Sequence, residues 1–207
     1  MKHTWFDCIF LGLATFFLTF EFPLFVSIAF SVTTGYVYLW ADSSNWKNLF
    51  TPLLIALGCV WFNPELNKII LTAMSILWLS YFLTPIYSSR KIPFLKNIVI
   101  ACIWSGFTLL HEINFTLSVV FFLMVFVLSI LIDLGDIDID PFLTIPKLIG
   151  TQKTNYFIVI LSVLAAVVSD SIPIAATLLF CIFLQYLVIK KEIRMLRELP
   201  FFIFCFS

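Results

Sequence analysis

Long apolar runs, separated by short polar segments, make up most of the chain. A helix that crosses the hydrocarbon core of a bilayer needs about 20 residues, and shorter runs are common in compact bundles whose flanking Trp, Tyr and Lys reach the interface. The pattern therefore predicts an all-α fold, a single integral membrane domain over residues 1–207 with eight spans and a C-terminal stub. The runs fall at about residues 5–20, 24–41, 49–62 (the weakest), 66–86, 95–110, 113–132, 155–169 and 172–189, and the stub begins at Phe201.

The composition agrees with a membrane protein. The 207 residues are 62% hydrophobic and 12% charged, with a mean hydropathy of +1.09. Soluble domains are about 45–50% apolar and about 25% charged, and one soluble core of this size could not hide the excess apolar surface. The formal net charge is zero, so no overall basic field recruits nucleic acid. The five cysteines lie in apolar runs without CxxC spacing, which indicates neither a zinc site nor a disulfide framework.

The polar connections between the runs alternate in length. If the N-terminus lies on the side of the long connections, 11 of the 12 Lys and Arg residues lie there too, and only Lys68 lies opposite. Because cytoplasmic loops of membrane proteins carry an excess of Lys and Arg, the N-terminus and the long connections are predicted to be cytoplasmic. The short connections are 21–23, 63–65, 111–112 and 170–171, and the long ones are 42–48, 87–97, 133–154 and 190–198.

Four carboxylates lie within eight residues at the end of the sixth run, at Asp133, Asp136, Asp138 and Asp140. If the helix continues through them, Asp133, Asp136 and Asp140 share one face, where their like charges repel and require a cation. Carboxylate oxygens with open coordination positions suit Mg²⁺, which also binds substrate phosphates. The alternative is a solvated acidic loop.

Two further polar segments are predicted to lie on the same side of the membrane. The segment 87–97 carries Tyr87 together with Arg90, Lys91 and Lys96, and such cations bind diphosphate oxygens. The alternative is the ordinary basic loop charge of a cytoplasmic face. The segment after the second run carries Asp42 and Asn45 and by itself resembles a helix end with an Asx or Ser turn. Together the three connections predict one cavity lined by acidic, basic and again acidic residues.

These motifs, in this order and after these runs, resemble those of the UbiA-type intramembrane prenyltransferases, which are nine-helix bundles. Asp133-x-x-Asp136-x-x-x-Asp140 is similar to the second Asp-rich motif of that family, and Tyr87-x-x-x-Lys91 is similar to its Tyr-x-x-x-Lys motif. The segment 144–150 resembles the T-[LIV]-P-x-x-x-G stretch that follows in the family. The resemblance covers residues from about 24 to 190.

The chain also departs from the family pattern. In the first Asp-rich motif only Asp42 remains, because Asn45 and Leu49 stand where the family has acids. Ile132 replaces the usual Asn before Asp133, the basic, Gly-containing segment after the second motif is missing, and the ninth run is a stub. A site with fewer carboxylates has less charge to offset two divalent ions, so binding of one metal is easier to accommodate than binding of two.

The resemblance implies transfer of a prenyl group from a prenyl diphosphate to an aromatic or lipid acceptor at the cytoplasmic face. It implies Tyr87 and Lys91 as catalytic residues, and Arg90, Lys91 and Lys96 as diphosphate ligands. The alternative is a non-catalytic relative that binds a lipid or a partner protein, and a small transporter is less favoured because no internal repeat is found. The implied Mg²⁺ ligands are Asp42, Asn45, Asp133, Asp136 and Asp140.

The predicted topology is tested with single cysteines at Ser89 and Ser171, introduced into a variant that lacks the five native cysteines. The two positions are expected to react with a membrane-impermeant thiol reagent from opposite sides, because they lie in connections assigned to opposite faces. Labelling of both positions from the outer side would contradict the topology.

Overall fold

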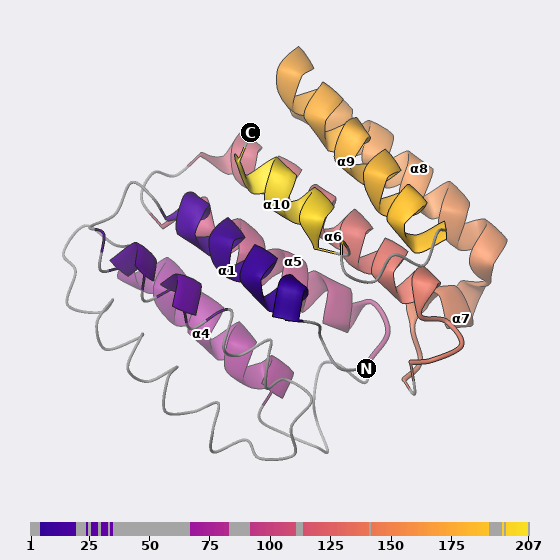
Figure 1. Cartoon of the computed structure of the whole chain (residues 1–207), viewed down its shortest axis with the longest axis horizontal. Coiled ribbons are helices and arrows are strands. Elements are labelled where there is room, and N and C mark those ends of the chain that lie inside the picture. The colour runs from indigo at the N-terminus through magenta and orange to yellow at the C-terminus, as the bar shows by residue number, and fades with distance from the viewer. Residues whose placement is uncertain are drawn as a thin grey trace.

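The computed structural model describes residues 5–19, 24, 26–28, 30–32, 34, 67–82, 92–110, 114–140, 142–190, 196 and 198–206. These residues form helices, turns and short connections, and no strand occurs among them. The helices pack side by side in a bundle (Figure 1). They are α1 (Trp5–Leu18), α4 (Lys68–Phe82), α5 (Leu95–Phe107), α6 (Phe115–Gly135), α7 (Ile145–Ile149), α8 (Thr151–Val168), α9 (Ile172–Lys190) and α10 (Leu199–Phe206).

Three helices, α6, α8 and α9, are long and apolar enough to cross a membrane, and α1, α4 and α5 contain shorter apolar helices. The all-helical prediction is therefore confirmed for the described residues, and several apolar helices are of the kind found in membrane proteins. The count of eight spans stays a prediction, since the run at 49–62 lies outside the described residues. The predicted loop over 133–154 is wrong in detail, because it contains the end of α6, the whole of α7 and the start of α8.

Helix α6 forms the centre of the bundle. It contacts α5 on one side and α8 and α9 on the other, and 56% of its most apolar segment is buried, against 22% for α8 and for α9. Its N-terminus is fixed by Asn114, whose side chain accepts a hydrogen bond from the Leu117 N–H, as expected of an N-cap residue. The residues from Val120 to Leu131 are almost all buried, whereas α8 and α9 leave large apolar side chains exposed, as lipid-facing helices do.

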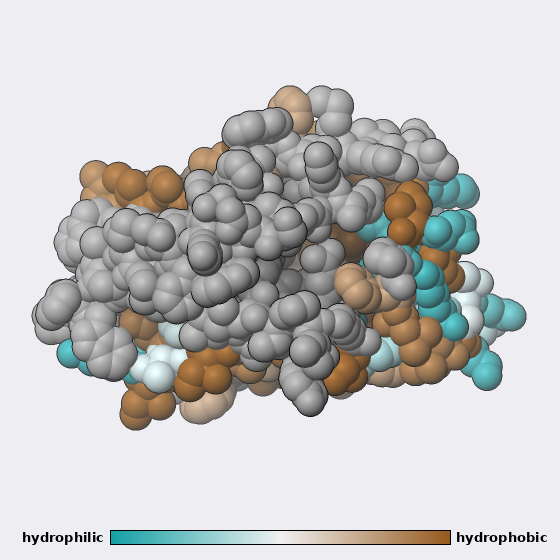
Figure 2. All heavy atoms as spheres, turned by 90° about the horizontal axis from the view of Figure 1, so that it is seen from below, coloured by the Kyte–Doolittle hydropathy of each residue, from teal (hydrophilic) through white to brown (hydrophobic). Residues whose placement is uncertain are grey.

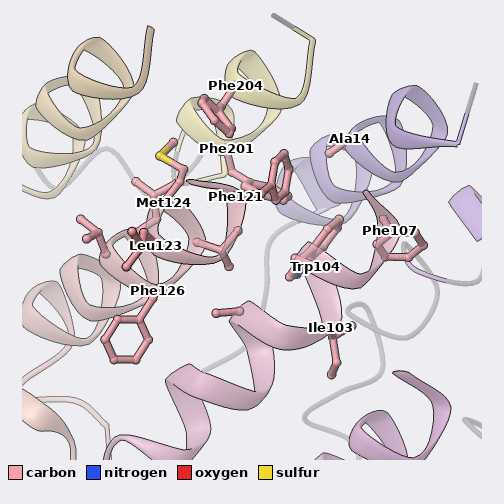
Figure 3. Close-up of a cluster of buried hydrophobic side chains, with 14 of the residues drawn as sticks. Ala14, Ile103, Trp104, Phe107, Phe121, Leu123, Met124, Phe126, Phe201 and Phe204 are labelled. Carbon is pink, nitrogen blue, oxygen red and sulfur yellow. The ribbon is translucent and has the colours of Figure 1, made fainter. Parts of the chain in front are cut away.

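The C-terminal helix α10 has eight residues, a length of about 12 Å, so it is too short to span. It nevertheless contributes to the core, because Phe201 and Phe204 point from α10 toward α5 and α6 (Figure 3). The ring centroids of Trp104 and Phe201 lie 4.5 Å apart, and those of Phe121 and Phe204 lie 5.3 Å apart. Such aromatic pairs contribute about 0.5–1.5 kcal/mol each beyond the burial of their area. The stub therefore packs as part of the bundle.

Two glycines allow helices to approach closely. A Cβ at Gly106 would lie 2.6 Å from the Cγ and Sδ atoms of Met74, so a larger residue there would force the Met74 side chain of α4 to shift. A Cβ at Gly135 would lie 2.9 Å from Cγ2 of Ile189, which places the C-terminal ends of α6 and α9 next to each other.

The start of α5, the end of α6, α7 and the start of α8 lie at one end of the bundle, on the right in Figure 1. On the face shown in Figure 2, the described hydrophilic residues gather mainly at this same end. The opposite end of α8 continues into α9 through a tight turn at Ser169–Ser171, where Asp170 has a positive φ of 47°. The tight connection predicted at residues 170–171 is therefore present. Of the residues that the sequence indicates for chemistry, Lys96, Asp133, Asp136 and Asp140 are described, and they lie at the polar end of the bundle.

Candidate functional site

The first turn of α5 and the last turn of α6 are joined by an ion pair. The Lys96 Nζ atom lies 2.5 Å from Oδ1 of Asp133 and 3.4 Å from Oδ2 of Asp140. The Asp133 side chain is only 2% exposed, while the side chains of Asp140 and Lys96 are 13% and 15% exposed. A carboxylate buried this deeply requires a cation and hydrogen-bond donors around it. Lys96 supplies the cation.

Asn97 supplies the donors for the second Asp133 oxygen. Its Nδ2 group donates to Oδ2 of Asp133 at 3.1 Å and to Oγ of Ser129 at 2.9 Å. The Ser129 hydroxyl in turn donates to the backbone oxygen of Phe126 at 2.8 Å. The amide assignment follows from chemistry, because the amide oxygen of Asn97 facing a carboxylate would be repelled. We refer to Lys96, Asn97, Ser129, Asp133 and Asp140 as the Lys96 cluster.

Asn97 and Ser129 were not identified from the sequence as members of this site. Both are buried polar residues inside otherwise apolar helices. Ser129 lies one helical turn before Asp133 and so shares its face, and Asn97 directly follows Lys96. The helical spacing from Asp133 could have indicated Ser129, whereas the role of Asn97 depends on the packing of α5 against α6. The Asn97 Oδ1 atom is buried and has no hydrogen-bond partner among the described residues, so it remains available as an acceptor.

The turn after α6 brings Asp140 back to Lys96. The helix ends at Gly135, and the backbone N–H groups of Ile139 and Asp140 both donate to the carbonyl oxygen of Asp136. Continuation of α6 through Asp140, which was the basis for placing Asp133, Asp136 and Asp140 on one helical face, is therefore wrong. The Asp140 carboxylate also accepts from the Phe142 N–H at 3.0 Å, an Asx-type turn that fixes its direction.

Among the described residues, no group of three or more His, Cys, Asp or Glu side chains lies close enough to hold a metal ion. Asp133 and Asp140 share the Lys96 ammonium, and Asp136 lies at the end of α6, partly exposed. The acids of this part of the chain therefore do not by themselves fit Mg²⁺, and the cation that neutralises two of them is Lys96. Five predicted site residues lie outside the described residues: Asp42, Asn45, Tyr87, Arg90 and Lys91.

Loss of Lys96 is expected to be the most damaging single change in the cluster. Lys96→Met would leave the buried Asp133 carboxylate without its cation, which costs about 3–5 kcal/mol in the free energy of unfolding. Asp133→Asn should lower the free energy of unfolding by less. In that variant Lys96 still has Asp140 as an ion-pair partner, and its side chain is partly exposed to solvent. Reversible unfolding in mixed detergent micelles measures both variants.

The double variant Lys96→Met/Asp133→Asn separates a specific ion pair from general damage. It should be more stable than Lys96→Met alone, because no buried charge is left unpaired. Lys147→Met is the matched control, since among the described residues the exposed Lys147 donates only to a backbone oxygen of Asp140. Additive losses in the double variant, or a loss in the control as large as in Lys96→Met, would show that the ion pair does not stabilise the bundle.

Comparisons of this chain with models of protein families, with curated proteins and with solved structures give no match.

Proposed function

We propose that this chain is a multi-pass membrane protein that binds a prenyl diphosphate at the Lys96 cluster and transfers its prenyl group to an aromatic or lipid acceptor, as UbiA-type prenyltransferases do. The N-terminus and the polar end of the bundle would face the cytoplasm. What supports the proposal is one juxtaposition: Lys96 from the basic segment lies against Asp133 and Asp140 from the acidic motif. Lys96 and Asp133 are 37 residues apart in sequence.

The geometry suits exchange of a cation between carboxylate and phosphate oxygens. Lys96 holds Asp133 tightly at 2.5 Å but Asp140 only at 3.4 Å, so its ammonium can turn toward a diphosphate with little loss of contact. Arg90 and Lys91 would add positive charge from the same segment, and Tyr87 would help to orient the diphosphate. Mg²⁺ is the cofactor that the resemblance implies, and its binding would require ligands beyond those of the Lys96 cluster, with Asp42, Asn45 and Asp136 as the candidates.

A second candidate is a non-catalytic relative that keeps the fold and binds a lipid or a partner protein. One observation favours it: both Asp133 oxygens already have partners, Lys96 and Asn97, so this carboxylate serves the joint between α5 and α6. The first acidic motif, which keeps Asp42 but has Asn45 in place of an acid, points in the same direction.

The two candidates are separated by binding of farnesyl and geranylgeranyl diphosphate to the purified protein, with and without Mg²⁺. Asp136→Asn is expected to weaken Mg²⁺-dependent binding about ten- to a hundredfold, because a contact to a charged group contributes about 1.5–3 kcal/mol. The loss of affinity in Asp42→Asn should lie at the lower end of that range. Asn45→Asp should strengthen Mg²⁺-dependent binding. Calorimetry in detergent measures the affinities.

Asp138→Asn is the control, since Asp138 is exposed and is not an implied ligand. No Mg²⁺-dependent response in either the wild type or Asn45→Asp would leave the non-catalytic candidate. Radiolabelled prenyl diphosphate, offered to membranes with quinone, haem and lipid acceptors, then tests transfer itself.

A further inference from the structure

An open groove of about 290 Å³ lies on α8, next to the segment that carries the Lys96 cluster. One wall is Phe94, two residues before Lys96, and the other residues come from the end of α7 and the first three turns of α8. The lining is almost entirely apolar, and two of its residues, Lys153 and Tyr156, have side chains that end in a polar group. It consists of Phe94, Ile149, Lys153, Tyr156, Phe157 and Ile160.

Local backbone conformations fix the two walls of the groove. Gly150 has a φ of 85°, a backbone conformation that glycine adopts more easily than other residues. This residue joins the end of α7 directly to the start of α8. Phe94 has a φ of 63° without being glycine, a strained conformation that persists only where packing holds it. The packing is aromatic: the Phe94 ring meets Phe157 edge-on at 6.3 Å, and Phe157 meets Phe126 of α6 at 6.4 Å. The Phe94 wall is therefore rigidly placed.

The groove opens on the outer surface of the bundle. Tyr156 is 63% exposed and Ile160 is 64% exposed, and both lie on the face of α8 that carries the exposed apolar side chains expected of a lipid-facing helix. The groove also lies at the polar end of the bundle, because it begins at the first turn of α8. An occupant would thus have its apolar part in the hydrocarbon region and its polar part at the interface.

Lys153 is the cationic residue among those that line the groove. Its side chain is exposed, and none of the described residues forms an ion pair or hydrogen bond with its ammonium. A lysine whose side chain helps to line an aromatic and aliphatic groove complements an anion that is attached to an apolar chain. We infer that the groove binds one anionic glycerophospholipid of the surrounding membrane, with an acyl chain along Phe157 and Ile160 and the phosphate at Lys153.

The inference is tested by native mass spectrometry of the full-length protein in detergent, after incubation with equal amounts of palmitoyl-oleoyl phosphatidylglycerol and phosphatidylcholine. Phosphatidylglycerol should be retained preferentially. Lys153→Ala should lower its retention about five-fold, the effect of one lysine near an anionic headgroup. Lys190→Ala is the matched control, because Lys190 lies at the end of α9 with its ammonium 6.0 Å from the Tyr186 ring centroid, outside the groove.

A second pair of variants tests the apolar part. Ile160→Trp should fill the groove and lower retention of phosphatidylglycerol, whereas Val167→Trp, at a similarly exposed position on α8 outside the groove, should not. Equal retention of the two lipids, or equal effects of the Lys153 and Lys190 changes, would overturn the inference. Displacement of the lipid by sn-glycerol 3-phosphate would indicate a site for a free phosphate compound. A dimer that is lost in Ile160→Trp would indicate that the groove binds a second copy of the chain. Either result would contradict the inference.

Discussion

A carboxylate buried at the end of a membrane helix needs a cation and hydrogen-bond donors within a few ångströms, and in this protein Lys96 and Asn97 supply them to Asp133. Both partners come from the first turn of α5. The interaction therefore fixes the position of α5 along the axis of α6. Because α6 is the helix that α5, α8 and α9 all contact, the position of this joint affects the packing of the whole bundle.

Apolar packing alone would define this arrangement poorly. Helices in lipid gain little from hiding apolar surface, so close approach at small residues and specific polar contacts decide their pairing. The chain uses both devices: Gly106 admits Met74 between α5 and α4, and Gly135 admits Ile189 between α6 and α9. The Lys96 cluster adds the polar contact between α5 and α6. The same cluster gathers charged side chains at the polar end of the bundle.

The sequence predicts the helices well because an apolar run of membrane length has few alternatives to a helix in lipid. It also indicates Lys96, Asp133 and Asp140 as site residues, and the structure brings these three together. It does not predict that α6 ends at Gly135, because the end depends on the hydrogen bonds of the following turn. The packing of α10 could not be predicted either, since eight residues are too few to show a buried face. Asn97 was missed because its partners are set by the contact between two helices distant in sequence.

The role of Lys96 is the point on which the proposals for the site depend. If its ammonium is the counter-ion of the acidic motif, removing it leaves the Asp133 and Asp140 carboxylates without a cation, and a divalent ion can then neutralise them in its place. The direct test is the Tm of the purified wild type and of Lys96→Met, each measured without divalent ions and with Mg²⁺. A separate measurement with Ca²⁺ in place of Mg²⁺ shows whether the effect is common to divalent ions. The expected result is that Mg²⁺ raises the Tm of Lys96→Met and changes that of the wild type much less. An equal rise in both proteins, or none in Lys96→Met, would contradict the assignment of Lys96 as that counter-ion.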